Sequence, residues 1–175
     1  MSKSEAQIAS IEELGKIVFR LHVWCHELCK KAMGCYLPIA GNVGIFCQSQ
    51  EEYEHLSTLA KTLTESSNNP DQKYFKLLEP CVFSDYQDIP WASYEYLYIR
   101  KPAEDSPQLW DIDFVLPPEE FETLKSKIRS GDANPLLKID EYRPGREMVM
   151  IYEDGADALP YISTREMAER MRVKF

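Results

Sequence analysis

Three strand-like segments follow one another in the middle of the chain, with no helical segment between them. They are residues 76–83, 94–100 and 111–116, and the second is the clearest because Tyr, Leu and Ile fill five of its seven positions. A doubly wound parallel sheet would alternate strands with helices. This clustering therefore predicts an α+β fold with a mixed, mainly antiparallel, curved sheet.

A long amphipathic helix is predicted ahead of these strands, over about residues 4–33, with Gly34 as its C-terminal cap. Its apolar residues recur at i, i+3 and i+4 spacing, and the apolar arc widens in the middle of the helix to include Trp24. An arc of that width has to be covered on more than one side. We therefore expect residues 1–34 either to pack on an α+β core formed by residues 35–175 or to form the seam of a homodimer.

Further elements surround the central strands and complete a single domain of 175 residues. The strand 42–47 precedes a helix whose capping box is Ser49 and Glu52, so that the order from residue 42 to 116 is βαβββ. The remaining predicted elements are a helix opened by Pro117 and Pro118, a strand over residues 147–152, and a short helix capped by Ser163.

Charge and composition exclude several classes of function. The net charge is −9, which disfavours binding to nucleic acid phosphates or to anionic lipid surfaces. There is no run of 18 uncharged apolar residues, and the first ten residues contain no apolar core typical of a secretory signal. The five cysteines show no paired spacing, so we expect free thiols and a cytoplasmic protein that does not enter a membrane.

The strands 94–100 and 111–116 both alternate between apolar and polar residues, which predicts a hairpin centred between Asp105 and Ser106. In this register Arg100 lies opposite Asp111, and Tyr98 lies opposite Asp113. One face of the hairpin then carries Leu97, Ile99, Ile112 and Phe114 as core. The other face carries the candidate ligand-binding residues Tyr96, Tyr98, Arg100, Asp111 and Asp113.

Two interpretations of the polar hairpin face remain open. It is a solvent-exposed face with a stabilising cross-strand ion pair, or it is the floor of a pocket with aromatic walls, one cation and two acids. The second interpretation predicts a small polar or anionic ligand, because the planar guanidinium of Arg100 matches a carboxylate or phosphate group.

A group of potential metal ligands lies on the predicted N-terminal helix. His22, Cys25, His26 and Cys29 fall within about 100° of arc on one side of the helix, and zinc takes nitrogen and sulfur ligands. The same arc coincides with the apolar stripe of the helix. The other interpretation is therefore that His22 is a buried, neutral core residue and that the cysteines are buried thiols.

The segment Trp110–Pro117 resembles a strand of the vicinal-oxygen-chelate (glyoxalase-like) superfamily, in which such a strand often ends in Val-Leu-Pro. The strand–helix–three-strand order and the segment Met150–Gly155 are similar to the βαβββ module of that superfamily, and the resemblance covers about residues 40–155. It implies a curved sheet with a concave face that binds a ligand. The superfamily usually holds its metal with His and Glu on strands, whereas Asp111 stands near the His position and all the histidines lie on predicted helices.

Three functional hypotheses follow from these patterns. The first is a small-ligand-binding protein that uses the face of Tyr96, Tyr98, Arg100, Asp111 and Asp113. The second is a non-catalytic interaction domain whose N-terminal helix binds a partner or a second copy. The third is a metalloprotein centred on His22, Cys25, His26 and Cys29. No cofactor is implied by any motif, and the sequence leaves open whether the protein is an enzyme.

Overall fold

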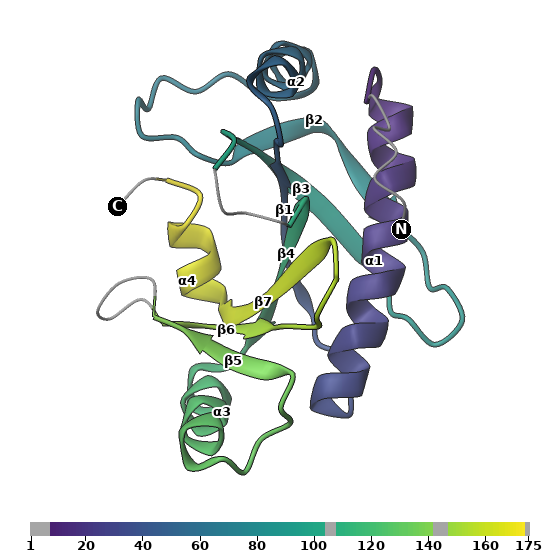
Figure 1. Cartoon of the computed structure of the whole chain (residues 1–175). Helices are drawn as coiled ribbons and strands as arrows, with labels where there is room; N and C mark the ends of the chain where they lie inside the picture. Colours follow the sequence, from purple (N-terminus) through teal and green to yellow (C-terminus); the bar gives the residue numbers. More distant parts are fainter. Residues whose placement is uncertain (1–7, 104–107, 142–146, 174–175) are drawn as a thin grey trace.

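The computed structural model describes residues 8–103, 108–141 and 147–173. The described residues form one mixed sheet of seven strands flanked by helices, as Figure 1 shows. The elements in chain order are α1 (Ile11–Met33), β1 (Ile39–Phe46), α2 (Gln50–Leu63), β2 (Phe75–Phe83), β3 (Ala92–Arg100), β4 (Trp110–Leu116), α3 (Pro118–Ser130), β5 (Leu137–Asp140), β6 (Met148–Ile151), β7 (Ala158–Thr164) and α4 (Arg165–Arg170).

The sheet has the strand order β2-β3-β1-β4-β7-β6-β5 and is built around the antiparallel pair β1 and β4. On one side β1 pairs in parallel with β3, and on the other side β4 pairs in parallel with β7. The remaining neighbours are antiparallel. The predicted α+β class and the mixed, mainly antiparallel sheet are therefore confirmed.

The helices are distributed unequally over the two faces of the sheet. Residues of α1, α2 and α3 belong to one continuous apolar cluster with the strands. By contrast, α4 contacts β1, β4 and β7 from the opposite side, where the second apolar cluster contains only Ala40, Val115 and Ala168. Figure 1 shows α1 and α4 on opposite sides of the sheet. None of the described helices is long and apolar enough to cross a membrane.

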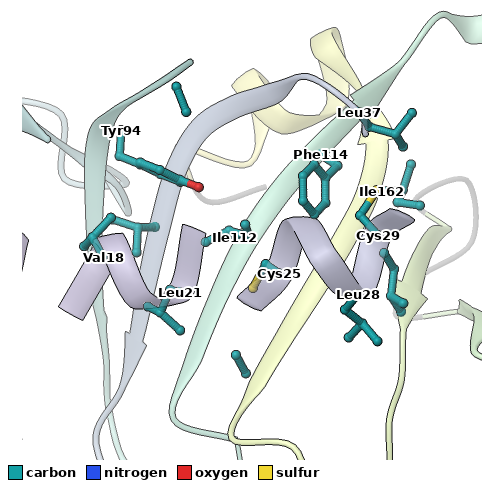
Figure 2. Close-up of a cluster of buried hydrophobic side chains, with 14 of the residues drawn as sticks. Val18, Leu21, Cys25, Leu28, Cys29, Leu37, Tyr94, Ile112, Phe114 and Ile162 are labelled. Atoms are coloured by element: carbon teal, nitrogen blue, oxygen red, sulfur yellow. The ribbon is translucent and has the colours of Figure 1, made fainter. Parts of the chain in front are cut away.

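The main core lies between α1 and the central strands. Figure 2 draws Cys25 of α1 in one cluster with Ile112 and Phe114 of β4, and all three residues are fully buried. Trp24 is half-buried and packs against the same cluster, so the wide apolar arc of the helix covers the sheet of its own chain. The burial of His22 that the sequence predicts is confirmed.

Local signals explain the ends of the helices. Ser10 caps α1 by accepting a hydrogen bond from the backbone N–H of Glu13, and Gly34 ends the helix in the left-handed conformation. The prediction that this helix begins near residue 4 is therefore wrong. At the other end of the chain, Thr164 rather than Ser163 caps α4, because it is the Thr164 side chain that accepts from the N–H of Met167.

Two strands escape prediction from the sequence. One is the edge strand β5, and the other is β7, which lies inside the sheet between β4 and β6. A proline in a segment argues against that segment being an inner strand, because proline has no N–H for the neighbouring strand. β7 contains Pro160. Without β7, the parallel partner of β4 could not be predicted.

The predicted hairpin of residues 94–116 is not formed. Its proposed loop at residues 105–106 lies outside the described residues, but β3 and β4 are not neighbours, because β1 lies between them. Arg100 is therefore opposite Phe46, and Asp111 is opposite Gly44. The physical reason is that β1 is almost entirely buried and takes an interior position, which separates the two strands that the alternation pattern had paired.

Candidate functional site

Although β3 and β4 are not paired with each other, polar and apolar residues still alternate along both strands. Leu97, Ile112 and Phe114 belong to the core cluster beneath α1, and the polar residues of the same strands point to the opposite side of the sheet. We call this opposite side the polar face. Its central residues are Tyr96, Tyr98 and Arg100 of β3, Asn42 and Gly44 of β1, and Asp111 and Asp113 of β4. The five residues predicted from the sequence thus share one face, although in a different arrangement.

Asp111 lies in a notch that only glycine provides. A Cβ atom at Gly44 would collide with Oδ1 of Asp111 and would lie 2.8 Å from its Cγ. Since Gly44 is the direct neighbour of Asp111 across the β1–β4 pair, the missing side chain makes room for the carboxyl group above β1. Asp111 is only 8% exposed, so the notch holds the carboxyl group largely out of solvent.

Asp113 is held by Asn42 and, through it, by the C-terminal segment. The side-chain amide of Asn42 donates to Oδ2 of Asp113 at 2.8 Å and to the backbone carbonyl of Ala168 at 3.1 Å. Its carbonyl oxygen accepts from Nε of Arg172 at 3.0 Å, and the Arg172 guanidinium stacks 3.6 Å from the centre of the Tyr96 ring. Asp113 is 2% exposed and Asn42 is 1% exposed, so this end of the network is buried, whereas Arg172 and Tyr96 are half-buried.

The two carboxyl groups hold their protons more tightly than ordinary aspartates. Burial and the neighbouring charge of Asp113 raise the pKa of Asp111 from 3.8 to about 7. Burial likewise raises the pKa of Asp113 to about 6, against the hydrogen bond from Asn42 and the charge of Lys73, which both lower it. Among the described residues, no Lys, Arg or His lies within ion-pairing distance of either carboxylate. The pair is therefore a buried acidic site that is not neutralised by direct contact.

Tyrosines surround this acidic pair. The rings of Tyr74 and Tyr98 are 5.1 Å apart, and the ammonium group of Lys73 lies 4.8 Å from the centre of the Tyr98 ring. On the other side of β4, Tyr161 is the direct neighbour of Asp113. Burial raises the pKa of both Tyr74 and Tyr161, so both phenols stay neutral and retain a hydroxyl that donates a hydrogen bond.

Arg100 lies at the edge of the polar face and is not paired with Asp111. Its guanidinium stacks 4.8 Å from the centre of the Phe46 ring, and it is half-buried. Within the described part of the chain no carboxylate lies within ion-pairing distance of Arg100. The charge of Arg100 still lowers the pKa of Asp111, because the two groups lie on strands that both flank β1. The planar guanidinium group of Arg100 has the geometry to bind a carboxylate or phosphate group.

Several residues of this face were not predicted as site residues. They are Asn42, Gly44, Lys73, Tyr74, Tyr161 and Arg172. The first two lie on the strand 42–47, and its alternation would have placed them on one face had β1 been assigned between β3 and β4. The others come from segments whose position depends on the tertiary fold: the backbone carbonyl of Arg172 accepts from the N–H groups of Lys73 and Tyr74.

The helix residues considered as metal ligands lie on the other side of the sheet. His22 Nδ1 is 3.2 Å from the Tyr94 hydroxyl, and His26 donates through Nδ1 to the carbonyl of His22 at 2.8 Å. Burial lowers the pKa of His22 to about 4 and raises the pKa of Cys29 to about 12. Across residues 8–103, 108–141 and 147–173, no three His, Cys, Asp or Glu side chains are arranged to hold a metal ion. This arrangement fits the interpretation of His22, Cys25, His26 and Cys29 as core residues.

Comparisons with known proteins inform the fold and not the site. No protein-family model matches the chain, and no curated protein matches it. A solved structure described as the structural-genomics protein EC4020 matches 91% of this chain and 91% of its own chain, with 17% sequence identity and a TM-score of 0.52. At this identity the similarity extends to the fold alone.

Proposed function

We propose that the protein binds a small polar ligand on the polar face, above Asp111 and Asp113. The observation that carries this proposal is the buried pair of carboxyl groups, which no cation of the described residues contacts directly. Burying an unpaired charge is costly, and a face that served only to support the fold would be more stable with apolar side chains. Ionisable groups with strongly perturbed pKa values are enriched at functional sites.

The surroundings favour a ligand that carries both a hydrogen-bond donor and an anionic group. An amino group or another donor would satisfy the carboxyl oxygens of Asp111 and Asp113. A carboxylate or phosphate group on the same ligand would meet the guanidinium of Arg100. The strands β3 and β4 are two strand spacings apart, about 10 Å, which suits a small molecule rather than a single ion. The resemblance to the vicinal-oxygen-chelate superfamily stays a prediction, and the ligand proposed here does not depend on it.

Three probes test this proposal: ethylammonium, acetate and 6-aminohexanoate, which carries both groups. We expect backbone amide shifts in β1, β3 and β4 on titration followed by NMR, with 6-aminohexanoate binding at least tenfold more tightly than either fragment. Asp111→Asn should reduce its affinity to that of acetate, and Arg100→Ala should reduce it to that of ethylammonium. Arg20→Ala, which removes an exposed arginine of α1, is the matched control.

A different pattern would refute the proposal. If none of the three probes shifts the amides of the polar face, the face is not a binding site for such groups. If Arg20→Ala weakens binding as much as Arg100→Ala does, the interaction is a non-specific effect of charge.

A further inference from the structure

An open groove of about 540 Å³ lies between α1 and the edge strand β2, away from the polar face. Its apolar lining comes from Ile11, Gly15 and Phe19 of α1 and from Pro80, Val82 and Phe83 of β2. Phe19 and Phe83, one from each side of the groove, are in edge-to-face contact, with ring centres 5.3 Å apart. The groove is therefore bounded on both long sides by regular secondary structure.

Exposed apolar side chains extend the groove over the edge of the sheet. Val82 is 54% exposed and Leu78 is 60% exposed, both on β2. In the turn after β2, Tyr86 is 42% exposed and Trp91 is 60% exposed, and the Tyr86 ring contacts Phe19 at 5.4 Å. Exposed apolar side chains beside an apolar groove are typical of a site where another molecule binds. A small apolar ligand in the groove would leave the side chains along the edge uncovered.

The structure of β2 indicates that the molecule bound in the groove is a helix rather than an additional strand. Pro80 has no N–H to donate, and the register of β2 against β3 shifts between Lys76 and Cys81. A partner strand would therefore find an interrupted row of hydrogen-bonding groups along this edge. A groove between a helix and the edge of a sheet accepts the apolar stripe of an amphipathic helix, which needs no backbone hydrogen bonds from its host.

The charges around the groove indicate the sign of the partner's charge. Of the ionisable residues that line it, Lys16 is bound to Glu12 at 2.6 Å, whereas Glu79 has no ion-pair partner among the described residues. The turn that carries the exposed aromatic residues adds two acids: Asp85, which accepts from the backbone N–H of Trp91 at 2.7 Å, and Asp88, whose charge also acts on Lys30 of α1. The whole chain has a net charge of −9, so a second copy would be repelled and a basic partner would be attracted.

From these observations we propose that the groove between α1 and β2 binds the apolar face of a basic amphipathic helix from another protein. Leucine-type side chains of that helix occupy the groove and cover Val82 and Leu78. Its lysine or arginine residues face Glu79 and the acidic turn. This interaction is separate from ligand binding on the polar face.

Synthetic helical peptides of 16 residues provide the test. One carries leucines at i, i+3, i+4 and i+7 spacing with lysines elsewhere, and the second has glutamates in place of the lysines. We expect the lysine peptide to bind in fluorescence anisotropy at about 0.15 M salt, where charges more than about 8 Å apart are screened, and the glutamate peptide not to bind. Val82→Arg should weaken binding at least tenfold, and Glu79→Lys should weaken it several-fold.

The controls decide between this occupant and others. Glu169→Lys makes the same change of charge on α4, on the opposite side of the sheet, and should leave binding unchanged. Urea midpoints close to that of the unchanged protein would show that each variant still folds. The proposal is overturned if Glu169→Lys weakens binding as much as Glu79→Lys, or if neither peptide binds. It is also overturned if light scattering finds a dimer that Val82→Arg converts to a monomer, because the occupant is then a second copy.

Discussion

The two faces of the sheet are covered by different interactions. Beneath α1, α2 and α3 the cluster is apolar and continuous. On the polar face the covering helix α4 has six residues, and its segment is anchored mainly by hydrogen bonds from Asn42, Arg165 and Arg172. The difference indicates that the face beneath α1 stabilises the fold, while the polar face gives up part of that stability to hold carboxyl and phenol groups in place.

Phe114 of β4 gives the largest test of this comparison, because its ring is buried in the core beneath α1. Phe114→Ala should lower the free energy of unfolding by about 3–5 kcal/mol, since it leaves a cavity in the apolar core. Urea denaturation measures the change. A loss of less than about 1 kcal/mol would show that the face beneath α1 does not carry the stability assigned to it.

Replacing Gly44 or Gly15 with alanine should change the free energy of unfolding in opposite directions. Gly44→Ala forces the carboxyl group of Asp111 out of its notch and should cost about 1–3 kcal/mol, as overpacking does. Gly15→Ala, with open space around the new atom in the second turn of α1, should stabilise the protein by about 0.5–1 kcal/mol. If Asp111 causes the strain, Gly44→Ala should cost much less in a background that already carries Asp111→Ala. Equal costs in both backgrounds would place the strain elsewhere.

On the face beneath α1, His22→Leu should change the free energy of unfolding by less than about 2 kcal/mol at pH 7, because it removes one hydrogen bond and keeps an apolar side chain. The pKa of His22 is lowered from 6.5 to about 4, so the unfolded state takes up the proton first as the pH falls. The contribution of His22 to stability should therefore be lost as the pH falls from 6.5 to 4, and His22→Leu should remove that loss. A metal released by the replacement would contradict the assignment of His22 to the core.

On the polar face the pH dependence has the opposite sign. The pKa values of Asp111 and Asp113 are raised from 3.8, so the folded state binds protons that the unfolded state releases between pH 4 and 7. Their contribution to stability is present below pH 4 and is lost as the pH rises to 7. Asp111→Asn should remove most of this loss and should leave stability at pH 7.5 equal or slightly higher. A steeper loss in the variant, measured by thermal unfolding across this range, would contradict the raised pKa values.

Sequence patterns predicted the two faces better than the order of the strands. Alternation within β3 and β4 is a local property, so it placed Tyr96, Tyr98, Asp111 and Asp113 on one face correctly. Which strand lies next to which is set by long-range pairing, and two wrongly paired strands with matching alternation look the same as the true neighbours. The insertion of β1 and the Pro-containing inner strand β7 therefore could not be read from the sequence.

The same limit applies to the residues that complete the site. Lys73 and Tyr74 reach the polar face because their backbone N–H groups bond to the carbonyl of Arg172, about 100 residues further along the chain. No local motif encodes that contact. The notch at Gly44 cannot be recognised by pattern analysis either, because a glycine inside a predicted strand is equally typical of a bulge.

Arg100→Ala should have the smallest effect on stability. The sequence placed Arg100 against Asp111, where its removal would cost about 0–1 kcal/mol on a solvent-exposed face and several kcal/mol in a water-poor pocket. In the structure the guanidinium is half-buried on Phe46 and no described carboxylate pairs with it, so the variant should lose only about 0–1 kcal/mol, measured by urea denaturation at pH 7.5. The same variant should further raise the pKa of Asp111, because the charge that lowers it is gone. That shift would appear in an NMR titration of the Asp111 carboxyl carbon. A stability loss of several kcal/mol would mean that Arg100 and Asp111 are directly coupled after all, and the polar face would then be a structural ion-pair network rather than an open site for an anionic group.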